Sequence, residues 1–200
     1  KAILGIEHIT EGTITYKGEK IVNKNFKEAI QRGFGLVPES RKEQGLVQMF
    51  SVKENICMVS MDKVIEGGVI RNSKVKEYAG EYVKKLRIAT PGIDTEVQYL
   101  SGGNQQKVVI AKWLTRDCDI LIFDEPTRGI DVGAKNEIYK LMNQLAAEGK
   151  AIIMISSEMT EILRMSDRIV VMCEGKKTGE LDISEATQEN IMNMATREIE

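Results

Sequence analysis

Two adjacent carboxylates, Asp124 and Glu125, follow the apolar run Ile120 to Phe123. A run without polar alternation is typical of a strand that is buried on both faces of a parallel sheet. Such a strand brings the residues after it to the edge where open α/β sheets bind ligands. Asp124 would hold Mg²⁺ there, directly or through water, and Glu125 would orient or deprotonate the water that attacks a γ-phosphate. The same pattern also fits a strand that ends in a solvated acidic turn.

A serine and two glycines, Ser101 to Gly103, stand before a helical pattern in the segment LSGGNQQK, residues 100–107. They would place a hydroxyl group and uncovered backbone N–H groups at a helix N-terminus, where anions bind. An ordinary serine cap with glycine in the preceding turn would have the same sequence. The anion site is favoured because a single helix separates this segment from the strand that ends at Asp124.

The elements that must position these residues alternate between short apolar runs and helical patterns, which is typical of an α/β fold with a mostly parallel sheet. The expected strands are residues 34–38, 120–123, 151–155 and 169–173. Apolar residues at helical spacing then predict a helix that Asp131 caps and Gly149 ends. Near the C-terminus, residues 174–177 predict a turn into a short edge strand, and Ser184 is expected to open the last helix.

Two further segments do not follow the alternation of apolar runs and helical patterns in this core. Residues 12–16 and 19–22 flank Lys17-Gly18 and predict a small antiparallel hairpin, and residues 25–28 have the spacing of a capping box at a helix start. The Met-rich stretch 51–99 has no clear strand pattern, so we expect a mainly helical insertion there.

Together these segments resemble the nucleotide-binding domain of an ABC transporter ATPase, which has a P-loop NTPase-like fold. Leu100 to Gln105 resembles the signature motif of that family, Ile120 to Glu125 its Walker B strand, and Gly129 to Asp131 its D-loop. The resemblance covers essentially the whole chain, because residues 51–99 lie where the family has its helical subdomain. It therefore implies one partial nucleotide-binding domain over residues 1–200.

Three longer segments narrow the resemblance. VPESRK (residues 37–42), LSGGNQQK and DEPTRGIDVGAK (residues 124–135) are similar to the second, C-terminal cassette of tandem monosaccharide importers of the ribose, galactose and xylose type. This implies an ATP-binding and ATP-hydrolysing subunit that couples energy to sugar import, with ATP and Mg²⁺ as cofactors. Cassettes of this kind act as dimers, in which ATP lies between the phosphate-binding loop of one and the signature motif of the other.

The resemblance also implies roles for individual residues. Asp124 would hold the metal, and Glu125 and Ser157 would occupy catalytic positions. Nucleotide contacts are implied for Ser101, Gly102, Gly103, Asn104, Gln105, Glu39 and Asp131. Glu39 stands where most members have the Q-loop glutamine, and Ser157 where most have a histidine whose positive charge would stabilise a developing phosphate charge. Both departures are typical of the second sugar cassette.

A GxxxxGK[ST] phosphate-binding loop occurs nowhere in the sequence. In the family, this Walker A loop and its strand come shortly before the segment that matches Lys1 to Gly5, so we expect the chain to begin just after them. Without backbone amides and a cation around the β and γ phosphates, Asp124 and Glu125 would have little to organise. The chain by itself is therefore expected to be inactive, although its signature motif could still complete a site on a partner cassette.

Composition excludes several other classes of protein. Lys and Arg number 28 against 30 Asp and Glu, so the net charge of −2 offers no basic excess for general nucleic-acid binding. The longest aliphatic runs are far shorter than the roughly 20 residues that span a bilayer. Cys57, Cys118 and Cys173 lack a CxxC spacing, and we expect reduced, buried thiols of a cytoplasmic protein.

The resemblance implies a peripheral location on the cytoplasmic face of the membrane. The expected partners are transmembrane permease subunits, a second nucleotide-binding cassette and, indirectly, a periplasmic or extracellular sugar-binding protein. One alternative function is a soluble ABC-type ATPase that acts on DNA or ribosomes, which the lack of a long heptad pattern between Glu39 and Ser101 disfavours. Another is a non-catalytic fragment that acts only in protein interaction.

Overall fold

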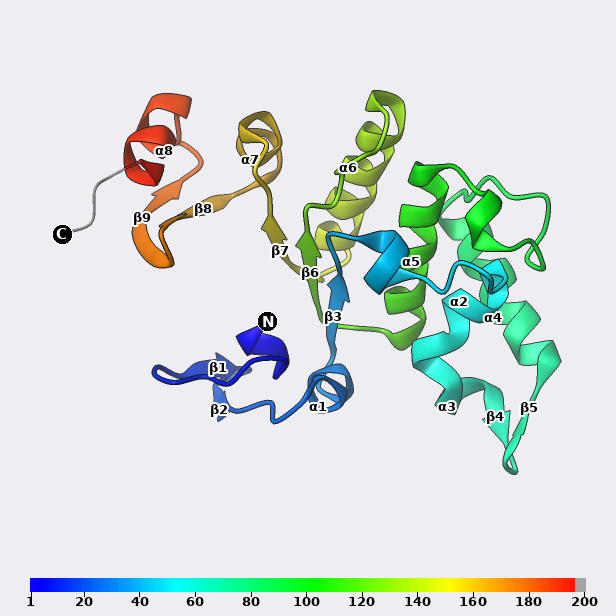
Figure 1. Ribbon diagram of the computed structural model, residues 1–200. Helices are drawn as coiled ribbons and strands as arrows, with labels where there is room; N and C mark the ends of the chain where they lie inside the picture. Colours follow the sequence, from blue (N-terminus) through cyan, green and yellow to red (C-terminus); the bar gives the residue numbers. More distant parts are fainter. Residues whose placement is uncertain (197–200) are drawn as a thin grey trace. The chain divides into compact units, whose positions relative to one another are not determined.

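The computed structural model describes residues 1–196, which divide into two compact units between Ile153 and Met154. The first unit is built on a sheet in which β6 (Ile120–Asp124) lies between β3 (Phe34–Val37) and β7 (Ala151–Ile155), whose first three residues belong to this unit (Figure 1). β3 and β6 run parallel, with Phe34 opposite Ile120. Leu121 and Phe123 on one face of β6 are fully buried, and Ile122 on the other face is buried as well. The expected strands are confirmed, and β6 is covered on both faces as its unbroken apolar run predicts.

The N-terminal hairpin is also confirmed. β1 (Ile14–Tyr16) pairs antiparallel with β2 (Glu19–Ile21). Lys17 and Gly18 between them both have positive φ, which is the two-residue turn that matches strand twist. The helix α1 (Phe26–Gln31) follows, and the Asn25 side chain accepts a hydrogen bond from the Glu28 N–H at 3.0 Å.

α5 (Gly102–Arg116) is the most deeply buried helix of this unit. It packs against β3 and three helices, namely α2 (Val52–Cys57), α4 (Asn72–Lys85) and α6 (Val132–Ala147). α6 (Val132–Ala147) begins where the sequence predicts, because the Asp131 carboxylate accepts a hydrogen bond from the Ala134 N–H at 2.9 Å. It ends at Glu148, and Gly149 follows with a φ of +88°. The charged residues Glu137 and Lys140 of α6 are exposed, whereas Ile138, Met142 and Leu145 are buried in the core.

Residues 51–99 are mainly helical. They contain α2 (Val52–Cys57), α3 (Met61–Val64) and α4 (Asn72–Lys85), with short 3-10 turns at Met58–Ser60 and Val97–Tyr99. A small hairpin of β4 (Ile65–Glu66) and β5 (Val69–Ile70), joined through Gly67 and Gly68 at positive φ, was not predicted. All four strand residues are exposed, so they lack the alternation of buried and polar positions that marks a strand.

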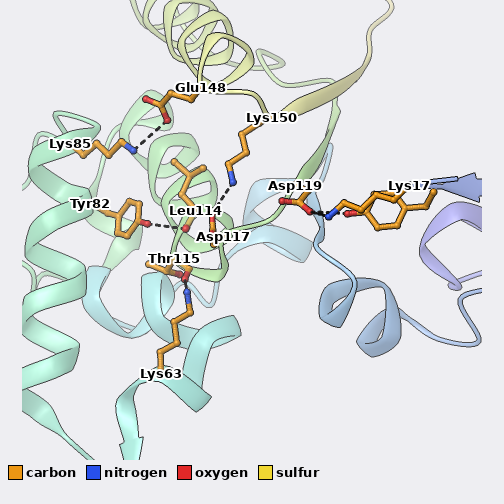
Figure 2. A network of polar contacts seen from close by, with 11 residues as sticks. Lys17, Lys63, Tyr82, Lys85, Leu114, Thr115, Asp117, Asp119, Glu148 and Lys150 are labelled. Carbon is orange, nitrogen blue, oxygen red and sulfur yellow. Dashed lines mark hydrogen bonds and ion pairs between the residues drawn. The ribbon is translucent and has the colours of Figure 1, made fainter. Parts of the chain in front are cut away.

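The C-terminal end of α5 is tied to its surroundings by polar contacts (Figure 2). The Leu114 carbonyl accepts a hydrogen bond from the Tyr82 hydroxyl at 2.8 Å, and the Thr115 carbonyl accepts one from the Lys63 ammonium at 2.6 Å. Asp117 pairs with Lys150 at 2.7 Å. The last carbonyls of a helix have no partner within it, so these cations and hydroxyls anchor α5 to the helical insertion and to the segment before β7.

The second unit contains α7 (Met159–Met165), β8 (Arg168–Cys173), β9 (Lys176–Asp182) and α8 (Gln188–Ala195). The strand expected at residues 169–173 is present as β8 and pairs antiparallel with β9. The prediction that Ser184 opens the last helix is wrong. Its hydroxyl and N–H both bond to the Asp182 carboxylate, and the Thr187 hydroxyl caps α8 instead, at 3.1 Å from the Asn190 N–H.

Two of the three cysteines are buried as expected. Burial raises the pKa of the Cys57 thiol to about 11 and that of Cys118 to about 12. Cys173 is only half-buried, because it ends β8 beside the turn at Glu174 and Gly175. Across residues 1–196 there is no helix with the length and apolar character needed to cross a bilayer.

Candidate functional site

Three loops that lie far apart in the sequence meet around Arg41. Its guanidinium donates from Nε to the Gln105 side-chain oxygen at 3.3 Å, from Nη1 to the Arg128 carbonyl at 3.0 Å and from Nη2 to the Gly129 carbonyl at 3.3 Å. Arg41 opens the π-helical turn Arg41–Gly45 that follows β3. One side chain therefore holds together the loop after β3, the start of α5 and the loop after β6.

This role of Arg41 was not predicted, because two of its three acceptors are main-chain carbonyls. Partial burial lowers the pKa of Arg41 from its ordinary value. No carboxylate among residues 1–196 forms an ion pair with it. Its positive charge is instead solvated by carbonyl and amide oxygens. The planar guanidinium has several N–H donors in fixed directions, so it can bind several loops at once.

The loop before α5 presents the predicted hydroxyl and N–H groups. Ser101 stands at the N-cap, but its hydroxyl does not bond to the helix backbone. It accepts a hydrogen bond from the Asn104 side-chain amide at 2.9 Å, while the amide oxygen of Asn104 accepts the Ala89 N–H at 2.8 Å. The ordinary serine cap is therefore excluded. The first N–H groups of α5 have no partner within the helix, and the Ser101 oxygen accepts none of them.

Close packing explains the two glycines of this loop. A Cβ at Gly102 would lie 2.6 Å from Nη2 of Arg41, and a Cβ at Gly103 would lie 2.6 Å from the Cβ of Ala134 in α6. Neither position has room for a side chain without displacing its neighbour. The glycines therefore let the start of α5 approach both Arg41 and α6.

Gln105 lies in the first turn of α5, beneath the loop that contains Ser101. It is 3% exposed. Its amide nitrogen donates to the Val97 carbonyl at 3.0 Å, and its oxygen accepts from Arg41. Both ends of the side chain are thus engaged within the protein, so its geometry suits support of the loop better than direct contact with a nucleotide.

Asp124 and Glu125 lie where β6 ends, and both are half-buried. Glu125 has a φ of +47°, the left-handed region that is unfavourable for a residue with a side chain. Such strain is found at functional sites, where the backbone turns a side chain in an unusual direction. Asp124 forms no ion pair or hydrogen bond through its carboxylate with any residue in 1–196, which leaves its oxygens available to a ligand.

A magnesium ion fits Asp124 as one ligand among several oxygens. Within residues 1–196, no three His, Cys, Asp or Glu side chains gather to hold a metal by themselves. Mg²⁺ commonly takes one or two carboxylates, with water and substrate phosphates completing its shell. An unpaired carboxylate at the end of β6 has the donor chemistry for that arrangement.

The two remaining loop acids have protein partners. The Glu39 carboxylate forms an ion pair with Arg128, so the negative charge that Glu39 introduces is compensated within the unit. Sequence reasoning missed Arg128 because the pair joins positions far apart in the chain. Asp131 caps α6. Ser157 is exposed and belongs to the second unit, in the turn between β7 and α7, so it is described only within that unit.

A sequence model of the ABC transporter family matches residues 1–128. The chain belongs to the ABC transporter family. Among proteins similar to this ABC chain, one from Burkholderia ambifaria named for ribose, galactose and methyl galactoside import is 51% identical over 98% of the chain. The ribose import ATP-binding protein RbsA of Bacillus subtilis is 47% identical over 98% of the chain. The chain spans 39% of the first protein's length and 40% of the second's.

Solved structures show the same ABC cassette fold. A dimeric ATP-binding cassette bound to ADP and phosphate aligns with a TM-score of 0.74 at 21% identity, covering 90% of this chain and 76% of that one. A nucleotide-free ATP-binding cassette aligns with a TM-score of 0.76 at 20% identity, covering 96% of this chain and 76% of the other. At such identities the likeness concerns the fold, and it confirms the expected α/β class with helices on a parallel sheet.

Proposed function

We propose that this protein is the ATP-binding and ATP-hydrolysing subunit of a monosaccharide importer. The observation that carries the proposal is the 51% identity to a sugar-import ATP-binding protein across 98% of the chain, which includes all the loops around Arg41. Residues 51–99 would be the helical subdomain of one partial nucleotide-binding domain over residues 1–200. Its loops would complete ATP sites in a dimer of cassettes.

On the hydrolytic side, Asp124 would be the metal ligand. Mg²⁺, when bound, supplies charge neutralisation on the β and γ phosphates of ATP. Glu125 would orient the attacking water and accept its proton as general base. The left-handed backbone at Glu125 supports this role, because it re-aims the carboxylate at the end of β6. Ser157 would stand near the γ-phosphate without adding a positive charge.

On the signature side, Ser101, Gly102 and Gly103 would meet the γ-phosphate of an ATP molecule held by the partner cassette. The Asn104 amide donates to the Ser101 oxygen, so the Ser101 O–H hydrogen is free to point at a phosphate oxygen. Backbone N–H groups at the start of α5 would add to it, because they have no partner within the helix and lie at the positive end of the helix dipole. Glu39 and Asp131 would border the same nucleotide.

The proposed partners follow from this role. Transmembrane permease subunits and a second cassette would bind the protein directly, and a sugar-binding protein outside the membrane would act through the permease. The protein would lie at the cytoplasmic face of the membrane. Nucleotide-driven closure of the cassette dimer would move the helical subdomain and so transmit energy to the permease.

ATP hydrolysis by the full-length protein in complex with its permease tests the proposal. Glu125→Gln keeps the size of the side chain and removes its basicity, so we expect a fall of roughly 10²-fold in the hydrolysis rate, as for loss of a general base. Glu77→Gln on the exposed face of α4 is the matched control and should leave the rate unchanged. An equal rate in the Glu125→Gln protein would overturn the assignment of the catalytic base.

A further inference from the structure

A cavity of about 560 Å³ opens between the end of α4, the first half of α5 and the middle of α6. Its charged lining consists of four basic side chains and one carboxylate, namely Lys85, Arg87, Lys107, Lys140 and Glu137. The volume lies in the range of small-molecule sites. Asn104, whose amide bonds to Ser101, also lines the cavity, whereas the five charged residues lie outside the loops that meet around Arg41.

The charges of the lining do not cancel. Lys107 is nearly buried, and its ammonium lies 2.8 Å from the Glu137 carboxylate and donates to the Arg87 carbonyl at 3.0 Å. The carboxylate of the lining is therefore already paired. Lys85 pairs with Glu148 at 3.5 Å (Figure 2). Arg87 and Lys140 form no ion pair with any carboxylate in residues 1–196. Two uncompensated cations thus line one cavity of a chain whose net charge is −2.

The backbone of Arg87 is strained. Its φ is +49°, and it stands directly after the C-cap of α4, where the Ile88 N–H bonds to the Val83 carbonyl at 2.9 Å and the Arg87 N–H to the Lys84 carbonyl at 3.2 Å. This hydrogen-bond pattern normally has glycine at that position. An arginine there indicates a use for its side chain that outweighs the strain.

Helix capping does not account for the whole cluster. Cations near the C-terminus of α4 interact favourably with its dipole, which explains lysines in its last turn. Lys140 comes from α6 and lies in the middle of that helix, so this dipole does not explain it. The feature that Arg87 and Lys140 share is the cavity that both of them line.

We propose that this cavity binds a small phosphorylated anion. Arg87 would hold a phosphoryl group through its planar set of donors, which match phosphate geometry. Lys140 and Lys85 would add positive charge from the opposite helices, and Lys107 would stay paired with Glu137 as part of the floor. The ligand carries at least two negative charges, which balances the two cations without a partner.

Isothermal titration calorimetry of the full chain with inorganic pyrophosphate tests this site. Arg87→Gly suits the left-handed backbone better than arginine does, so the protein should keep or raise its Tm while its affinity for pyrophosphate falls roughly tenfold or more, as for a lost charge-assisted contact. Lys140→Gln should weaken binding to a similar extent. Lys76→Gln, on α4 but outside the cavity, is the control and should bind as the wild type does.

The outcomes separate this site from other anion-binding loops. Unchanged affinity in Lys140→Gln would overturn the proposal even if Arg87→Gly lowered the Tm, because Lys140 has no part in the cap of α4. Equal affinity for citrate and pyrophosphate would overturn the assignment to phosphoryl groups. Loss of binding in both variants with an unchanged Tm would support it.

Discussion

The side-chain amide of Asn104 donates a hydrogen bond to the hydroxyl oxygen of Ser101 at 2.9 Å. The Asn104 oxygen accepts a hydrogen bond from the Ala89 N–H at 2.8 Å, so the amide nitrogen, a donor, must be the atom that faces Ser101. Asn104 thereby joins the loop after α4 to the loop before α5. It leaves the Ser101 hydroxyl as a donor toward an anion.

Asn104→Asp isolates this relationship. The carboxylate can still accept the Ala89 N–H, but it has no hydrogen to donate to Ser101 and would instead draw the hydroxyl toward itself. We expect ATP hydrolysis by the assembled complex to fall roughly tenfold, with a stability loss of about 1 kcal/mol for one hydrogen bond. Asn143→Asp, on the exposed face of α6, is the control for the added charge. Equal hydrolysis in the two variants would contradict the role of Asn104.

Arg41→Lys tests whether one side chain joins the three loops. A lysine keeps the charge but cannot reach Gln105, Arg128 and Gly129 together, because an ammonium lacks the fork of a guanidinium. We expect a loss of about 1–3 kcal/mol in the free energy of unfolding, measured by urea denaturation. The neighbouring exposed Lys42→Gln should be nearly neutral. A variant at Arg41 as stable as that control would refute the arrangement.

Gly103→Ala probes the approach of α5 to α6. The added methyl group would meet the Cβ of Ala134 at 2.6 Å, so the helices must separate, at a cost of about 1–3 kcal/mol. Ala134→Gly in the same protein removes the clashing atom and should recover part of the loss. A double-mutant cycle by thermal denaturation measures the coupling, and additive effects would show that the two positions do not clash.

The buried ammonium of Lys112 should make the free energy of unfolding increase with pH. Burial lowers the pKa of its ammonium to about 8, and its one bond is to the Gly45 carbonyl at 2.5 Å. The unfolded chain therefore binds more protons than the folded chain between about pH 8 and the ordinary lysine pKa near 10.4, so the free energy of unfolding increases across that window. Denaturation at pH 7 and pH 9.5 measures the increase.

The matched variants for this pH effect are Lys112→Met and Lys27→Met. The first removes the buried ammonium and should flatten the pH dependence, whereas the second removes an exposed ammonium from α1 and should keep it. The same slope in both variants would show that Lys112 does not cause the effect. Tyr82 acts in the opposite direction, because burial raises its pKa to about 12 and its contribution declines from about pH 10 upward.

Local patterns predict much of this fold. The unbroken apolar run of β6 indicates its burial on both faces, and Asp131 with Gly149 bounds α6 correctly because caps are short-range chemistry. The prediction that Ser184 caps the last helix is wrong because its hydroxyl donates a hydrogen bond to Asp182, two residues away. The β4–β5 hairpin is hidden because its exposed residues lack the pattern of a strand.

The sequence predicts the motifs of the candidate site, but it does not predict the hydrogen bonds and ion pairs that join them. Asp124, Glu125 and Ser101 follow from residue types at the ends of elements. The functions of Arg41 and Arg128 depend on partners more than 60 positions away in sequence, some of them backbone atoms, which no short motif encodes. The burial of Gln105 likewise results from packing of α5 against the chain before it.

Sugar uptake tests the central claim most directly. The full-length protein and its permease, reconstituted in proteoliposomes with ATP on the cassette side, are supplied with labelled ribose and galactose together with the sugar-binding protein. The proposal predicts ATP-dependent uptake of at least one of these sugars, which Glu125→Gln abolishes and Glu77→Gln preserves. ATP hydrolysis with no uptake of any monosaccharide, or uptake that is unaffected by removal of ATP, would contradict it.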